Sequence, residues 1–164
     1  MIVVLTGPVR SGKTTALERR FGGDAAAAGI LAPDVGGLRH LYSLRAGRAV
    51  QLEYRPGEAR PGEPVAEADL TRVGRFAFFA AAFAWARGEL RAALADPPRT
   101  LVVDEVGPLE LRRGDGLEPL VGAVVAAYRD RPDARALLVV RDALLAEALA
   151  HYRLDAAAVV RLRP

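Results

Sequence analysis

The chain has 164 residues, of which 51% are hydrophobic and 26% charged, with a formal net charge of +3 and no cysteine. This composition is typical of a soluble globular domain with a sizeable core, and it excludes a disulfide framework. No signal peptide precedes the first predicted strand and no apolar stretch is long enough to cross a bilayer, so we expect one domain over 1–164, located in the cytoplasm.

The first predicted elements are a strand, a loop and a helix. Ile2 to Thr6 is a continuous apolar run, which is typical of a strand buried on both faces. A loop from Gly7 to Thr14 follows, and the helix after it runs to about Phe21, where Gly22-Gly23 ends it. The loop fits the pattern G-x-x-x-x-G-K-[ST] at every fixed position and has the context that this motif requires, a strand before and a helix after.

This loop predicts a site for the phosphates of a nucleotide. Its glycines let successive backbone N–H groups point inward and form an anion nest at a helix N-terminus. Lys13, the only lysine in the chain, is expected to reach the β- and γ-phosphates, and the Thr14 hydroxyl to ligate Mg²⁺. The predicted nucleotide-binding residues are Gly7, Pro8, Val9, Arg10, Ser11, Gly12, Lys13, Thr14 and Thr15.

The middle of the chain gives weaker signals. Gly29 to Ala32 predicts a second strand, and the runs Leu38 to Arg45 and Arg48 to Tyr54 resemble a hairpin. The run RPGEARPGEP, Arg55 to Pro64, is too rich in proline, glycine and charge to pack, which predicts a surface loop. The clearest helix is predicted from about Arg75 to Leu94, because large apolar residues recur at spacings of three and four.

The last third continues the alternation of strands and helices. Strands are predicted over Thr100–Val103, Ala136–Val140 and Ala158–Leu162, with a helix over about Leu117–Tyr128 and another that begins with Asp142 as its N-cap. This order of elements predicts an α/β fold, a three-layer α/β/α P-loop domain with a mainly parallel sheet and an antiparallel hairpin.

A second motif, LVVDEVGPLEL from Leu101 to Leu111, has the form of a Walker B strand. Asp104 at the end of the apolar run is expected to hold Mg²⁺ beside the P-loop. The adjacent Glu105 is the predicted catalytic base, because a carboxylate there can orient and deprotonate a water that attacks the γ-phosphorus. Glu110 is expected either to order the loop that follows or to pair with an arginine. Arg141 falls at the C-terminal end of a predicted strand, where it serves either the γ-phosphate or a structural ion pair.

The run DEVGPLEL resembles the signature of the small THEP-type P-loop nucleoside-triphosphatases, the cancer-related nucleoside-triphosphatase family. GILAP at Gly29–Pro33, VGRFAF at Val73–Phe78 and LVVR at Leu138–Arg141 are similar to one bacterial branch of that family. The resemblance implies a RecA-like fold and Mg²⁺-dependent hydrolysis of several nucleoside triphosphates to the diphosphate and phosphate. Residues 38–69 match the family pattern poorly, so the resemblance does not extend to substrate selection.

The sequence therefore predicts a Mg²⁺-dependent nucleoside triphosphatase with Lys13, Glu105 and Arg141 as catalytic residues. Two alternatives use the same P-loop: a nucleotide or small-molecule kinase, and a nucleotide-dependent switch or adaptor. No nucleic-acid partner is expected, because Arg112-Arg113 lacks the interleaved aromatics of such a site. The chain contains no asparagine, so the guanine-specificity motif N-K-x-D is absent, and we expect promiscuity among nucleotides.

Overall fold

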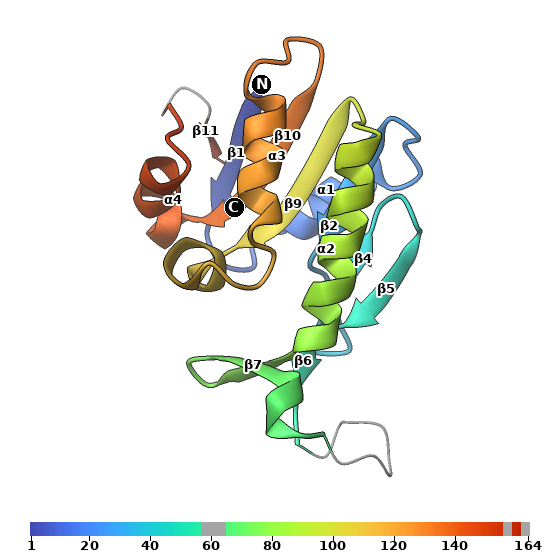
Figure 1. Cartoon of the computed structure of the whole chain (residues 1–164), viewed down its shortest axis with the longest axis vertical. Helices are drawn as coiled ribbons and strands as arrows, with labels where there is room; N and C mark the ends of the chain where they lie inside the picture. Colours follow the sequence, from blue (N-terminus) through green and yellow to red (C-terminus); the bar gives the residue numbers. More distant parts are fainter. Residues whose placement is uncertain (57–64, 156–158, 162–164) are drawn as a thin grey trace.

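The computed structural model describes residues 1–56, 65–155 and 159–161, which form two β-sheets with helices on both faces of the larger one (Figure 1). The larger sheet has the order β11-β1-β10-β9-β2-β4-β3, and β5 pairs with β4. Its parallel strands are β1 (Ile2–Gly7), β2 (Ala27–Leu31), β9 (Thr100–Val106), β10 (Arg135–Arg141) and β11 (Val159–Arg161). Its antiparallel strands are β3 (Asp34–Val35), β4 (Leu38–Ser43) and β5 (Arg48–Gln51). The mainly parallel sheet with an antiparallel hairpin is confirmed.

The three layers follow from the alternation of side chains along the buried strands. On β9, Leu101 and Val103 belong to the larger core cluster, whereas Val102 points to the opposite face. The larger cluster also contains apolar residues of α2 (Ala80–Ala95), α3 (Leu120–Arg129) and α4 (Leu145–His151). The smaller cluster is covered by α1 (Lys13–Phe21) through Leu17 and Phe21. The sheet therefore lies between α1 on one side and the other three helices on the other.

The predicted helix over Arg75–Leu94 is wrong at its start. Residues Phe76–Phe79 form strand β8, which pairs antiparallel with β7 (Leu70–Val73) and with β6 (Glu53–Tyr54) in a separate three-stranded sheet. The FAFF run fits the periodicity of a helix and that of a strand. Phe76 and Phe79, three residues apart, continue the apolar stripe of the predicted helix. Phe76 and Phe78, two residues apart, lie on one face of the strand with their rings stacked. Pairing with β7 decides for the strand, and α2 begins at Ala80.

Smaller differences concern three other predicted elements. The second strand of the hairpin, expected over Arg48–Tyr54, is interrupted at Leu52, so that β5 stays in the large sheet and β6 joins the small one. The helix expected from Leu117 begins at Leu120. The predicted N-cap Asp142 instead begins a 3₁₀ turn (Asp142–Leu144), and its carboxylate accepts a hydrogen bond from the Thr6 hydroxyl at 2.8 Å. Of the predicted loop Arg55–Pro64, residues 57–64 lie outside the described part of the chain.

The remaining described elements are short. A 3₁₀ turn covers Glu67–Asp69, and a π-helical turn, η2, covers Leu109–Arg113. None of the helices in the described part of the chain is long and apolar enough to span a membrane. The register of the parallel strands sets Gly7 beside Arg141 and Ile30 beside Val103, so the residues that follow β1, β2 and β9 meet at one edge of the sheet. Ligands of open α/β sheets bind at this carboxyl edge.

Candidate active site

The P-loop connects β1 to α1 at the carboxyl edge of the sheet. Gly12 precedes the helix with a φ of 80°, a left-handed conformation that glycine adopts without steric cost. Pro8, Val9 and Arg10 are exposed, so the Arg10 side chain does not pack in the core. The loop is therefore open to solvent on the side where a phosphate would enter.

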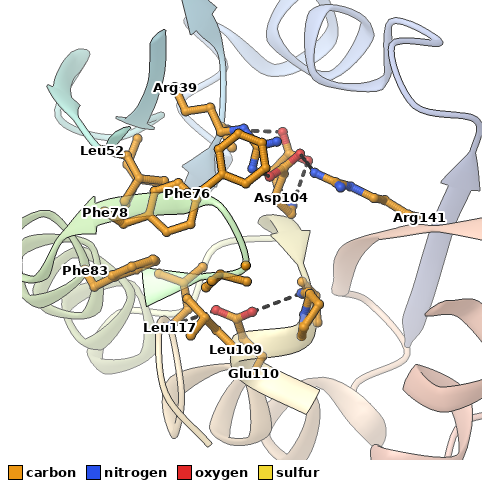
Figure 2. Close-up of a pocket in the computed structure, with 18 of the residues that line it drawn as sticks. Arg39, Leu52, Phe76, Phe78, Phe83, Asp104, Leu109, Glu110, Leu117 and Arg141 are labelled. Atoms are coloured by element: carbon orange, nitrogen blue, oxygen red, sulfur yellow. Dashed lines mark hydrogen bonds and ion pairs between the residues drawn. The ribbon is translucent and has the colours of Figure 1, made fainter. Parts of the chain in front are cut away.

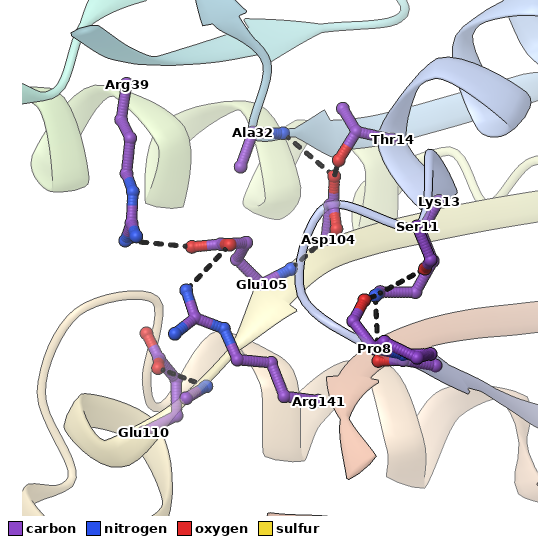
Figure 3. Close-up of polar contacts among 12 residues, drawn as sticks. Pro8, Ser11, Lys13, Thr14, Ala32, Arg39, Asp104, Glu105, Glu110 and Arg141 are labelled. Carbon is purple, nitrogen blue, oxygen red and sulfur yellow. Dashed lines mark hydrogen bonds and ion pairs between the residues drawn. The ribbon is translucent and has the colours of Figure 1, made fainter. Parts of the chain in front are cut away.

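The Lys13 ammonium lies within the loop, where three acceptors surround it (Figure 3). It donates to the backbone carbonyl of Gly7 at 2.9 Å, to that of Pro8 at 2.6 Å, and to the Ser11 hydroxyl at 3.1 Å. All three acceptors are oxygen atoms close to the ammonium. The oxygens of a bound phosphate would take their place. The lysine is thus held at the loop rather than extended into solvent.

Asp104 joins the P-loop to the Walker B strand. Its side chain is buried and accepts hydrogen bonds from the Thr14 hydroxyl at 2.6 Å and from the Ala32 N–H at 3.1 Å through Oδ2. Its Oδ1 accepts from the Glu105 N–H at 2.8 Å. Burial raises the pKa of the Asp104 carboxyl above its ordinary value, while the hydrogen bonds from Thr14 and Ala32 favour the charged form.

The predicted metal ligands fit a magnesium ion in their chemistry. Thr14 and Asp104 offer two hard oxygen donors that already touch each other, and Mg²⁺ binding to nucleotides uses one or two protein oxygens with phosphates and waters. Within the described residues, no group of three or more His, Cys, Asp or Glu side chains forms a cage for a metal. The residues present therefore suit an ion that arrives with a nucleotide better than one bound by protein alone.

Glu105 leaves the regular strand path through a backbone irregularity. Its φ is 58°, which is uncommon for a residue with a side chain, and the pairing of β9 with β10 shifts register between Val103 and Val106. Such bulges re-aim side chains near active sites. As a result Asp104 is turned into the protein beside Thr14, whereas the Glu105 side chain keeps 34% of its surface exposed.

Two arginines on different strands form ion pairs with the Glu105 carboxylate (Figure 3). Arg141, at the end of β10, donates to Oε1 at 3.0 Å, and Arg39, on β4, donates to Oε2 at 3.2 Å. The Arg39 guanidinium also lies over the ring of Phe76, 5.0 Å from its centroid. Arg141 therefore forms the ion pair that the sequence left open, and it forms it with the predicted base. Arg39 was missed, because one arginine among 22 with no motif around it gives no signal.

Glu110 orders the loop after the Walker B strand, as expected. Its buried carboxylate accepts the backbone N–H of Gly107 through Oε2 and that of Leu117 through Oε1, both at 2.9 Å. Burial raises the pKa of this carboxyl, and the two backbone donors act against that rise. Because both oxygens are engaged inside the loop, Glu110 is a structural residue here. The structure brings the other predicted residues together: Lys13, Thr14, Asp104, Glu105 and Arg141 line one region of the sheet edge.

Comparisons with known proteins bear on the fold. No family model matches the chain, and no curated protein matches it. Among solved structures, the crystal structure of THEP1 from the hyperthermophile Aquifex aeolicus is similar to this chain with a TM-score of 0.69, at 20% sequence identity, covering 100% of this chain and 91% of that chain. This likeness shows the fold: the chain has the α/β architecture of THEP1, and the fold that the DEVGPLEL resemblance implied is confirmed.

Proposed function

We propose that this chain is a Mg²⁺-dependent nucleoside triphosphatase of the THEP type, which hydrolyses ATP, GTP and other nucleoside triphosphates to the diphosphate and phosphate. The observation that carries the proposal is the hydrogen bond of 2.6 Å between Thr14 and Asp104. It joins two motifs that lie 90 residues apart in the chain, each of which has the residues for one half of a phosphate and metal site. The similarity in fold to THEP1 supports the same reading.

Each chain residue has a role that its chemistry suits. When a nucleotide binds, the Lys13 ammonium gives up its hydrogen bonds to the loop carbonyls and donates to oxygens of the β- and γ-phosphates instead. The backbone amides of the loop donate to the same phosphate groups. Mg²⁺, when held by Thr14 and Asp104, would neutralise charge on the phosphates. Arg141 is the register partner of Gly7 on the neighbouring strand, and we expect its guanidinium to contact the γ-phosphate. Positioned cations of this kind stabilise the charge that develops during phosphoryl transfer.

Glu105 is the residue that makes water the acceptor. Its carboxylate takes a proton from a water molecule as the water oxygen attacks the γ-phosphorus, and the diphosphate leaves. The two arginine contacts fix the direction of the carboxylate before substrate arrives, which lowers the entropy cost of alignment. A nucleotide-dependent switch or adaptor would use the same residues. Without its partner, however, such a protein would not need to complete more than one round of hydrolysis.

Phosphate release from ATP, GTP, CTP and UTP, with Mg²⁺ or with excess EDTA, tests this proposal. We expect multiple turnovers with all four nucleotides in Mg²⁺ and none in EDTA. The kcat/KM values for ATP and GTP should differ by less than about a hundredfold, or roughly 2.7 kcal/mol, because no base-specific motif is present. A single turnover only, or equal rates in EDTA, would contradict the proposal.

A further inference from the structure

An apolar cavity of about 260 Å³ adjoins Glu105 (Figure 2). Asp104, Glu105, Arg39 and Arg141 line it, but no residue of the P-loop does. Figure 2 shows Arg39, Asp104 and Arg141 at one end and Phe83, Leu109 and Leu117 at the other, with Glu110 beside Leu109 and Leu117. Most of its wall consists of large apolar side chains: Leu41, Leu52, Phe78, Phe83, Leu109 and Leu117. The cavity thus extends from the predicted base into the space between the small sheet and the loop after β9.

The buried polar side chains of this wall already have partners in the protein, and the exposed Arg75 lies over the ring of Phe76, 5.1 Å from its centroid. Asp104 accepts three hydrogen bonds, Glu110 accepts two backbone N–H groups, and Arg39 and Arg141 pair with Glu105. Among the described residues, the buried side-chain polar atom without a partner is Trp85 Nε1, which does not line the cavity. A ligand body among the buried side chains of the cavity would therefore need no hydrogen-bonding groups, since every buried polar side-chain atom of the described wall has a partner.

We propose that this cavity binds a small uncharged alcohol with an aromatic or aliphatic body, and that the chain transfers the γ-phosphoryl group to its hydroxyl. The inference rests on the proposed function, because it uses the same P-loop and Glu105. The volume is below the roughly 300–1,000 Å³ of drug-sized sites, so the body is about one ring with a short arm.

The side chains around Glu105, at one end of the cavity, determine which head group a ligand can have there. A carboxylate or phosphate placed there would face the Glu105 carboxylate and the γ-phosphate, while Arg39 and Arg141 already neutralise charge in their pairs with Glu105, so like charges repel. A hydroxyl donates its proton to Glu105, whose two oxygens each accept one arginine and keep further lone pairs. It would then occupy the position that water takes in hydrolysis.

The transfer step balances without a further reactant. The hydroxyl oxygen forms a bond to the γ-phosphorus, and the bond from that phosphorus to the bridging oxygen breaks. The diphosphate leaves with the electron pair, and the hydroxyl proton passes to Glu105. The products are a phosphate monoester and the nucleoside diphosphate, whereas hydrolysis gives inorganic phosphate and the same diphosphate. The ratio of diphosphate to inorganic phosphate therefore separates the two reactions.

The experiment measures both products from MgATP in the presence of benzyl alcohol or 2-phenylethanol, with toluene as the control that lacks the hydroxyl. Without alcohol, and with toluene, the ratio of ADP to phosphate is expected to be one. With an alcohol, ADP should exceed phosphate by at least about twofold, since a bound hydroxyl is aligned better than a water molecule. The missing phosphate should appear as the monoester in the ³¹P NMR spectrum.

Substitutions at Val73 test whether the cavity is the acceptor site. Val73 lines the cavity, whereas Val50 does not line it and is likewise a half-buried valine packed against the core. Val73→Phe should fill the cavity and return the ratio to one with ATP hydrolysis retained, while Val50→Phe keeps the transfer. Should Val73→Phe fail to fold, Val73→Ala is the second variant, and widening should favour 2-phenylethanol over benzyl alcohol by at least about threefold.

Two results would overturn the acceptor site: a ratio of one with both alcohols, or equal transfer by Val73→Phe and Val50→Phe. In the first case hydrolysis of ATP without alcohol would still stand, so the two proposals fail separately. Transfer to alcohol with no hydrolysis in its absence would instead overturn the hydrolase and support the acceptor site.

Discussion

Lys13 is the single lysine in a chain that places arginine at its other 22 basic positions. Its ammonium fits among the carbonyls of Gly7 and Pro8 and the hydroxyl of Ser11, with contacts of 2.6 to 3.1 Å. A lysine ammonium is compact and bonds in any direction, whereas the guanidinium of arginine is a wide planar fork. We therefore expect the loop to accommodate the ammonium in this place and not a guanidinium.

Lys13→Arg should lose most of its hydrolysis although the charge is kept. We expect kcat/KM to fall by about 10²- to 10³-fold, the cost of roughly 3 to 4 kcal/mol for a misplaced donor to developing phosphoryl charge. The melting temperature should not change, because the side chain faces the loop and not the core. Arg19→Lys, on the exposed side of α1, is the control. A purely electrostatic role for Lys13 predicts near-wild-type kinetics instead, and that result would sink the steric account.

Arg39 acts on the reaction through Glu105. Its guanidinium contacts that carboxylate at 3.2 Å and none of the P-loop contacts in the structure involve it. Arg39→Ala should therefore lower kcat by about tenfold with KM for ATP nearly unchanged, which corresponds to about 1.4 kcal/mol of coupling. In a Glu105→Gln background the same substitution should add little further loss. Additive losses in the double variant would show that Arg39 works independently of Glu105.

At the scale of elements, the contact between β2 and β9 depends on Gly29. Its φ is 125°, and a Cβ atom built there would lie 2.0 Å from the Val102 carbonyl oxygen. Since that atom belongs to the backbone of the neighbouring strand, no rotamer change can relieve the overlap. Ala32 directly follows β2 and Asp104 lies on β9, so the close approach of the two strands also positions the site.

Gly29→Ala should destabilise the fold by about 2 to 4 kcal/mol, the combined cost of a left-handed alanine and an overpacked strand pair. Gly88→Ala is the matched control, because Gly88 lies inside α2 with open space around it. That change should stabilise the protein by about 0.4 to 1 kcal/mol. Thermal unfolding of both variants checks the pair, and a Gly29→Ala protein as stable as wild type would refute the packing argument.

The elements differ in how far the sequence could predict them. β1, β9 and β10 are short apolar runs bounded by turn residues, and local pattern suffices for such strands. The FAFF segment could not be resolved locally, since the choice between strand and helix depends on pairing with β7. The same holds at the site: the spacing of the motifs predicted Lys13 and Asp104, but a register shift in β9 aims Glu105, and only the folded sheet brings Arg39 to it.

For the molecule as a whole, the strand order assembles the site from distant parts of the chain. β1 supplies the P-loop, β9 the two carboxylates and β10 Arg141, all at the carboxyl edge of parallel strands. The antiparallel β4 adds Arg39 from the other side of β2, and residues of the small sheet line the apolar cavity beside Glu105. The predicted catalytic base, the two arginines that position it and the apolar cavity therefore all lie at the Glu105 carboxylate.

Turnover by Glu105→Gln, measured as phosphate release at saturating MgATP beside the affinity for the nucleotide, is the most direct test of this account. Glutamine keeps the size of the side chain and its carbonyl can still accept from one of the two arginines, but its amide NH2 takes the place of the second acceptor oxygen and it cannot take a proton. We predict an affinity within about threefold of wild type and a kcat lower by about 10²-fold or more, the range of general-base catalysis. Glu18→Gln, exposed on α1, should match wild type in both. Near-full turnover by Glu105→Gln would contradict the account, because the proton acceptor would then lie elsewhere.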